Sequence, residues 1–194
     1  MLKSSLRSPS GLYPKLLGDS WRNLHPAVRR LHSSDAPACA VGVFQIWRGT
    51  NWLARTLARL ARLPRAGEAV NVRLFINARD DGEEWRRIFA DKPFVTLQSD
   101  GGDGLLTERV GRAEVRFRLK VVDGVLTYQS ARAALCLGAW RVRLPRWCAP
   151  QITACESAAG EGDQIDVSVE VRLPWLGRLV AYHGKLTQAE ARAC

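Results

Sequence analysis

The sequence predicts an α+β protein that is mostly β: a strongly curved antiparallel sheet or barrel of about nine or ten strands, with helices at its N-terminal end. Three observations predict this fold class. From residue 70 onward, apolar and polar residues alternate in successive short runs, as they do in strands with one buried face. Short turns rich in Gly and Asp join most of these runs, so neighbouring strands should pair antiparallel. An open sheet of this size tends to curl or to close on itself.

The helices are predicted in the first third of the chain. Residues 1–10 are polar and basic and predict a disordered lead, whereas residues 11–33 predict a helical arm. After a first strand over 39–48, Thr50 or Asn51 can cap an amphipathic helix over residues 52–63. We expect this helix to cover the sheet, and an alternative is that its basic face contacts anionic lipid. One side of it carries leucines and another carries arginines: Leu53, Leu57 and Leu60 against Arg55, Arg59 and Arg62.

The β domain is predicted over residues 38–187 and is followed by a tail over 188–194. Residues 134–150 contain Pro145 and Pro150 and are ambiguous between a crossing segment and a short helix. The other expected strands span residues 70–79, 84–89, 94–99, 105–110, 112–122, 125–132, 151–156, 163–173 and 178–186.

Two predicted turns bring polar side chains to the apolar face of the sheet. If residues 123–124 form a two-residue hairpin turn, residues opposite each other across the hairpin share a face. A turn at residues 111–112 places Glu108 beside Val115 on the same face. Because Arg132 is expected opposite Val115 on its other side, Glu108 and Arg132 should meet over this small side chain. The polar residues that the 123–124 hairpin turns inward are Tyr128, Ser130 and Arg132.

Two further strands contribute to this inward face. Arg87 alternates in phase with Trp85 and Phe89, so it points inward if these aromatic side chains do. Pairing in the last hairpin points Tyr182 inward as well. The candidate ligand-binding residues are therefore Trp85, Arg87, Phe89, Glu108, Phe117, Tyr128, Ser130, Arg132 and Tyr182.

This inward polar set has three interpretations. In the preferred interpretation, the domain binds a small hydrophobic or amphipathic molecule and does not catalyse a reaction. Arg87 and Arg132 hold the anionic or polar head of this molecule, and aromatic residues contact its apolar part. In the second, Glu108 acts as an acid or base with Tyr128 or Tyr182 as proton donor. In the third, Glu108 and the arginines form a buried ion network that fixes the strand register.

Composition limits the other classes of function. The net charge is +10, but basic residues are spread along the whole chain, so we predict no specific nucleic-acid partner. No apolar run is long enough for a transmembrane segment, although peripheral membrane contact stays open. The three histidines lack ligand-like spacing to Cys, Asp or Glu, so neither a metal nor a cofactor is expected. Five cysteines without a CxxC motif fit reduced thiols and a cytoplasmic location.

The order of short motifs resembles a bacterial family catalogued only as domain of unknown function 4166. The motifs are LHPAVRRLH at 24–32, WRG at 47–49, WRRIF at 85–89, LTERVG at 106–111, DGVL at 123–126, LP at 144–145 and YHGKL at 182–186. The resemblance covers roughly residues 11–187 and draws attention to Trp85, Arg87, Phe89, Glu108 and Tyr182.

The resemblance implies no assigned activity. It implies domains that occur alone or follow a saccharopine-dehydrogenase-like, nucleotide-binding oxidoreductase domain. Because this chain lacks a GxGxxG unit, we expect any such oxidoreductase to be a separate protein.

Overall fold

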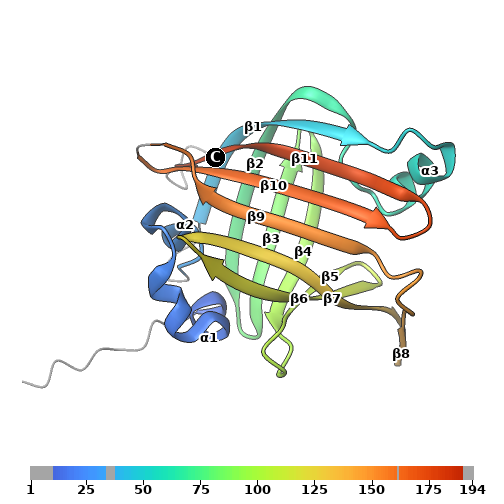
Figure 1. Ribbon diagram of the computed structural model, residues 1–194, viewed down its shortest axis with the longest axis horizontal. Coiled ribbons are helices and arrows are strands. Elements are labelled where there is room, and N and C mark those ends of the chain that lie inside the picture. Colours follow the sequence, from blue (N-terminus) through green and yellow to red (C-terminus); the bar gives the residue numbers. More distant parts are fainter. Residues whose placement is uncertain (1–10, 34–37, 161, 190–194) are drawn as a thin grey trace, which may run out of the picture.

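In the computed structural model, which describes residues 11–33, 38–160 and 162–189, a closed β-barrel forms the body of the protein. The strands of these residues form one sheet in the order β6-β5-β4-β3-β2-β1-β11-β10-β9-β7-β8, and neighbouring strands pair antiparallel. An additional pairing of β6 with β7 closes ten of the described strands into the barrel and leaves β8 outside the closure (Figure 1). The predicted fold class is confirmed.

The strands lie close to the predicted runs and extend several of them. The segment predicted as ambiguous, 134–150, contains the end of β7 and the short strand β8. The bounds are β1 Ala38–Arg48, β2 Gly67–Arg79, β3 Gly82–Phe89, β4 Lys92–Asp100, β5 Leu106–Val110, β6 Ala113–Val122, β7 Val125–Leu137, β8 Trp140–Arg143, β9 Gln151–Ala158, β10 Gln164–Leu173 and β11 Gly177–Ala189.

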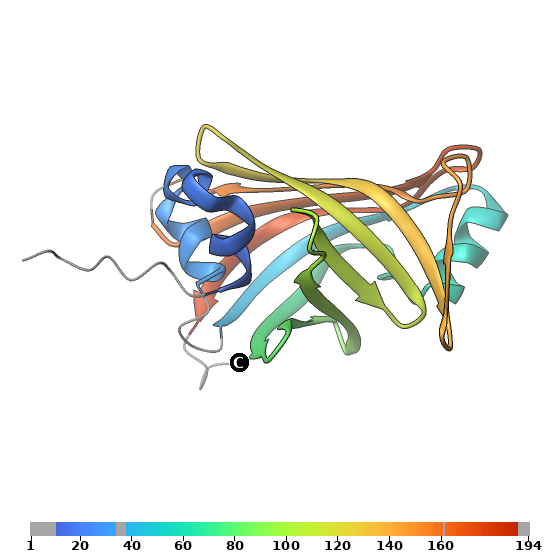
Figure 2. The ribbon, with the colours of Figure 1, turned by 90° about the horizontal axis from the view of Figure 1, so that it is seen from below.

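Helices lie at both ends of the barrel (Figure 2). The arm, residues 11–33, forms α1 (Leu12–Leu17), the 3-10 helix η1 (Gly18–Asn23) and α2 (Pro26–Leu31) at one end. The other end carries α3 (Trp52–Leu60), with Asn51 accepting a hydrogen bond from the Leu53 backbone as its cap. We call these the arm end and the α3 end. The predicted helix 52–63 stops earlier than expected because the chain reverses at Arg62, which adopts a positive φ of 54°.

The arm packs on its own barrel and plugs the arm end. Tyr13, Ala27, Val28 and Leu31 have almost no exposed surface and belong to the main apolar core. The His25 backbone donates to the carbonyl of Gly124 in the β6–β7 turn, which ties the start of α2 to the barrel. Of the predicted terminal segments, the lead 1–10 and residues 190–194 of the tail lie outside the described residues, and β11 continues to Ala189.

Most of the predicted register is confirmed, and one bulge changes the site. Glu108 is opposite Val115 and Leu119 is opposite Tyr128, as the two turns required. Between Ser130 and Arg132, however, β7 contains one extra residue, so Arg132 pairs with Arg116 instead of Val115. A one-residue bulge reverses the facing of all later side chains. The prediction that Arg132 faces the interior beside Glu108 is therefore wrong.

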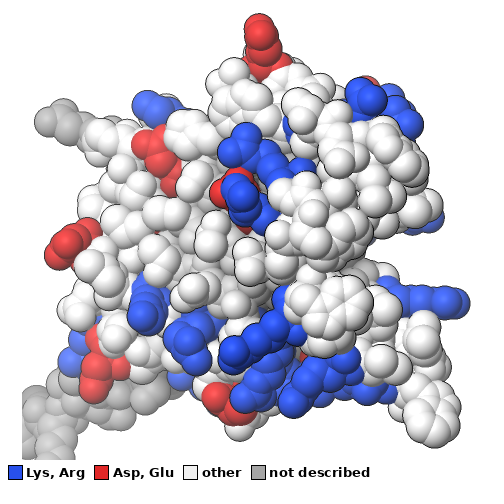
Figure 3. All heavy atoms as spheres, turned by 45° about the vertical axis from the view of Figure 1, so that its right-hand side comes forward, with Lys and Arg blue, Asp and Glu red and all other residues white. Residues whose placement is uncertain are grey.

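Charge is distributed unevenly between the two ends. At the α3 end, segments 49–66 and 138–150 contain seven arginines and no Asp or Glu. At the arm end, the strand connections 80–81, 101–105 and 123–124 contain four aspartates and no Lys or Arg. Figure 3, in which the α3 end comes forward, shows Lys and Arg side chains gathered around a largely uncharged surface. The strand connections are thus basic at the α3 end and acidic at the arm end, whereas the arm itself adds Lys15, Arg22, Arg29 and Arg30 against Asp19.

Two smaller predictions concern cysteines and membrane helices. Cys39 is disulfide-bonded, so the expectation of reduced thiols is wrong at that residue, whereas Cys136, Cys148 and Cys155 are free. Among the described residues, no helix has the length and apolar character needed to cross a membrane.

Candidate functional site

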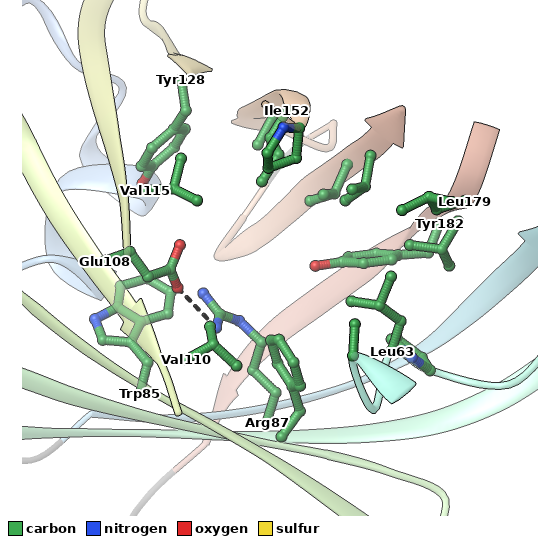
Figure 4. A pocket seen from close by; sticks show the side chains of 18 of the residues that line it. Leu63, Trp85, Arg87, Glu108, Val110, Val115, Tyr128, Ile152, Leu179 and Tyr182 are labelled. Atoms are coloured by element: carbon green, nitrogen blue, oxygen red, sulfur yellow. Dashed lines mark hydrogen bonds and ion pairs between the residues drawn. The ribbon is translucent and has the colours of Figure 1, made fainter. Parts of the chain in front are cut away.

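The barrel encloses a cavity of about 510 Å³. It extends from Leu31 of the arm to Leu57 and Leu60 of α3 and Leu63 just beyond it. Inward positions of nearly every strand line it, because the period-two alternation turns their apolar residues away from solvent. Figure 4 shows Val110, Val115, Ile152 and Leu179 among the side chains around this space. Most of the wall is apolar, and its polar groups are few.

Seven of the nine predicted site residues line the cavity: Trp85, Arg87, Phe89, Glu108, Phe117, Tyr128 and Tyr182. Ser130 does not, because its hydroxyl donates to the Pro150 carbonyl and accepts from the Ile152 backbone, which ties β7 to the segment that begins β9. Arg132 lies on the outer surface and pairs with Asp103 at 3.1 Å, with half of its side chain exposed. These two residues are corrections to the predicted site.

Arg87 and Glu108 form the polar centre of the cavity. Arg87 Nη1 donates to Glu108 Oε1 at 3.3 Å and to Thr96 Oγ1 at 3.1 Å, and its guanidinium lies 4.8 Å from the Trp85 ring centroid. Some 17% of the Arg87 side-chain surface remains exposed although the residue lies inside the barrel, so the exposed part faces the cavity. Burial opposes its charge, but the nearby Glu108 carboxylate raises the pKa of Arg87, which stays a charged donor.

A hydrogen-bonded network continues from this pair to the arm. Gln98 donates to Glu108 Oε1 at 3.5 Å and accepts from the Tyr13 hydroxyl at 2.8 Å. A second set begins at Tyr128, whose hydroxyl lies 3.2 Å from both the Tyr13 hydroxyl and Glu156 Oε1. The other oxygen of Glu156 contacts Nε2 of the fully buried His32. Side chains from β3, β4, β5, β7, β9 and the arm are therefore joined in one buried network.

The buried tyrosines are held as neutral hydroxyls. Burial, reinforced by the charge of Glu156, raises the pKa of Tyr13 and of Tyr128 well above the ordinary value. Burial also raises the pKa of Tyr182 to about 12, although Arg87 opposes this rise. Each of these groups is consequently a proton donor in hydrogen bonds at neutral pH.

Some polar groups of the cavity have capacity for a further partner. Within the described residues, no hydrogen bond engages the Tyr182 hydroxyl, Nη2 of Arg87 or Oε2 of Glu108. In Figure 4 the Tyr182 hydroxyl and the Arg87 guanidinium both point toward the middle of the cavity. The site therefore offers two donors and one acceptor to a polar group located between them.

Several members of the network were missed by the sequence analysis. Glu156 lies on β9, whose register no tight turn fixes in the sequence, and it lines the cavity. Thr96 and Gln98 are buried on β4 while Val95 and Leu97, between and beside them, are partly exposed. On β4 the polar side chains thus face inward and the apolar ones face outward. The alternation of apolar and polar residues over 95–98 was the sequence signal from which this facing could have been predicted. Tyr13 and His32 reach the site from the arm, and no local pattern predicts that placement.

A metal centre is not indicated by the described residues. No three His, Cys, Asp or Glu side chains among them come close enough together to hold an ion. The described residues give the cavity hydrogen-bonding groups, the Arg87–Glu108 ion pair, the Glu156–His32 contact behind its wall and a large apolar surface.

Comparison with known proteins places the chain in a family. No curated protein and no solved structure matches the chain. A family model described as "Domain of unknown function (DUF4166)" matches residues 24–186. This range contains β1 to β10 and most of β11, together with α2, and so includes the barrel and nearly all of the cavity wall. The chain therefore belongs to the DUF4166 family.

Proposed function

We propose that the barrel binds an apolar ligand with an uncharged polar head, such as a long-chain alcohol or ketone, without catalysing a reaction. The cavity of about 510 Å³ carries this proposal, because its volume falls in the range of small-molecule sites and its wall is mostly apolar. Burial of apolar surface would supply most of the affinity. A purely structural domain with a buried ion network would be expected to have a filled interior instead.

The charges around the cavity favour an uncharged head over an anionic one. Arg87 is already matched by Glu108, and Glu156 adds a second carboxylate to the wall. With Arg132 on the outer surface, an anionic head would meet two carboxylates and one guanidinium. A hydroxyl or carbonyl can instead accept from Arg87 or Tyr182, and a hydroxyl can also donate to Glu108.

The proposal is tested with three eighteen-carbon conjugated-tetraene probes that differ only in their terminal group: an alcohol, a carboxylic acid and a hydrocarbon. Fluorescence titration of the full chain should give saturable binding, with the alcohol tightest. Native mass spectrometry of the freshly purified protein should also show a co-purified small molecule. Failure of all three probes to saturate the protein, together with a mass equal to the bare chain, would overturn the proposal.

Tyr182→Phe should weaken binding of the tetraene alcohol by about two- to tenfold, the cost of one hydrogen bond. The substitution removes only the hydroxyl, which has no partner within the described residues, so the fold should keep its stability. Affinity for the tetraene hydrocarbon serves as the internal control and should not change. An equal loss of affinity for both probes would show that the hydroxyl does not contact the head group.

A second candidate is proton-transfer catalysis, and one observation favours it. Tyr128 and Glu156 both line the cavity, and His32 contacts Glu156 from behind. Hydrogen-bonded side chains in this order can move a proton to or from a substrate. A separate oxidoreductase would act on the same substrate before or after the proton transfer. Chemical change of the co-purified molecule by the wild-type protein, and not by Glu156→Gln, would favour this candidate over binding alone.

A further inference from the structure

We propose that the α3 end of the barrel docks on an anionic phospholipid bilayer. Exposed tryptophans would insert at the level of the headgroups, and the surrounding arginines would neutralise the anionic lipids. This inference concerns the outer surface of the protein. It stands whether or not the cavity takes the ligand proposed above.

Four exposed tryptophans gather at the α3 end. Trp52 begins α3, Trp140 begins β8, Trp147 follows β8, and Trp175 lies in the β10–β11 turn. Their exposed fractions are 70%, 78%, 69% and 54%, in that order. Indole rings are amphipathic and concentrate where an apolar phase meets water, so four of them on one exposed end favour an interface with lipid.

The packing of α3 turns its leucines toward the same end. The helix is held on the barrel by Ala54 and Ala58, which are fully buried, and it contacts β11 and β1. Leu60 lines the cavity and yet is 75% exposed, so it stands at the rim between the cavity and solvent. Because α3 buries its small alanines and exposes Leu60, part of its apolar surface faces solvent. Lipid acyl chains could cover that surface.

The charge at this end complements an anionic surface. The two segments that carry α3 and β8 contain seven arginines and no acidic residue, whereas the arm-end connections 80–81, 101–105 and 123–124 contain four aspartates and no Lys or Arg. Beside β8, an outer cleft of about 280 Å³ is lined by Arg116, Arg132, Arg141 and Arg143, with Glu114 as its acidic member. Asp103 pairs with Arg116 and Arg132, and Glu114 pairs with Arg141, so within the described residues Arg143 is the arginine of this cleft that has no ion pair. A guanidinium binds phosphate oxygens through two parallel N–H groups, so Arg143 is the member best placed to contact a lipid phosphate.

Docking in this orientation has a consequence for the cavity. Leu57, Leu60 and Leu63 line it at the α3 end, and Leu135 and Leu144 line it near β8. The same surface that carries the tryptophans and arginines therefore surrounds one end of the cavity. In a docked barrel, that end of the cavity would lie against the bilayer. An apolar molecule could then pass from the lipid into the cavity without crossing water.

The test is flotation of the full chain with vesicles of pure phosphatidylcholine and with vesicles that contain phosphatidylglycerol. We expect binding to the anionic vesicles at low salt, release at high salt, and tryptophan quenching by brominated lipid. Arg55→Glu/Arg59→Glu/Arg146→Glu and, separately, Trp52→Ala/Trp140→Ala/Trp147→Ala should each weaken partitioning at least tenfold. All six side chains are exposed, so both variants should fold, and both should still bind the tetraene probe in solution.

The matched control is Arg22→Glu/Arg118→Glu/Lys120→Glu, which makes the same charge change at exposed residues near the arm end. It should keep most of the vesicle binding. The inference is overturned if the wild-type protein ignores anionic vesicles at low salt, or if the arm-end control loses as much binding as the α3-end variant. If the protein binds single-stranded DNA and does not bind vesicles, the basic surface is a nucleic-acid site, and the proposal of membrane docking is overturned.

Discussion

Glu156→Ala is expected to lower the free energy of unfolding by about 3 kcal/mol. Only 8% of the Glu156 side chain is exposed, and its two oxygens accept from Tyr128 and contact Nε2 of His32. Removal of the carboxylate takes the charged partner from His32 and one partner from Tyr128, whose hydroxyl keeps only the neutral Tyr13 hydroxyl and the His32 ring within reach. Each unsatisfied buried group costs about 1–3 kcal/mol. Urea denaturation at neutral pH, followed by far-ultraviolet circular dichroism, measures the change.

The matched control for this variant is Glu170→Ala. Glu170 also receives two partners, Arg172 and Arg178, but both arginines are half exposed on the outer surface of the barrel. Surface ion pairs of this kind contribute about 0–1 kcal/mol. A loss at Glu156 no larger than the loss at Glu170 would mean that the buried network does not hold the arm on the barrel. Glu156→Gln should lie between the two, because an amide keeps part of the hydrogen bonding.

The inward side of the sheet was predictable from the sequence wherever a tight turn fixed the register. The turns at 111–112 and 123–124 placed Glu108 and Tyr128 correctly, and the period of two did the same for Arg87. In the last hairpin, Tyr182 faces inward as predicted and pairs with Val169, although the structure contains a register shift near the turn. Turn geometry and alternation are local properties, so they can be read from a single sequence.

Arg132 shows where such local reasoning fails. The register is correct as far as Ser130, and one extra residue in β7 then turns Arg132 outward, where it joins Arg116 and Asp103. The segment around the bulge contains no Gly or Pro to mark it. A bulge whose residues have ordinary backbone preferences leaves no trace in composition, and only closure of the barrel reveals it.

The remaining parts of the site depend on contacts between distant segments. His32 and Glu156 are 124 residues apart, and Tyr13 reaches Gln98 across 85 residues. Their meeting follows from docking of the arm on one end of the barrel, which no periodicity encodes. The cavity itself is also a property of the closed sheet, because its volume is set by strand number and tilt and by how far the inward side chains reach.

Val115→Trp is expected to weaken binding of the tetraene alcohol by roughly tenfold or more, equivalent to at least about 1.4 kcal/mol. Val115 projects into the cavity beside Tyr128 and next to Glu108 on the neighbouring strand, so an indole there would occupy space needed by the ligand (Figure 4). Because the cavity has room for the larger side chain, the loss of stability should stay near the lower end of the about 1–3 kcal/mol that overpacking costs. Fluorescence titration and urea denaturation separate the two effects.

The control for this variant lies on the same strand. Val122 is 58% exposed and is absent from the cavity wall, so Val122→Trp adds the same side chain to β6 without filling the interior. It should bind the tetraene alcohol as the wild type does. If Val115→Trp binds equally well while remaining folded, the probe occupies a surface elsewhere and the interior of the barrel is not the binding site. If only Val115→Trp loses affinity, the ligand lies inside the barrel, between Glu108 and the strands that face it.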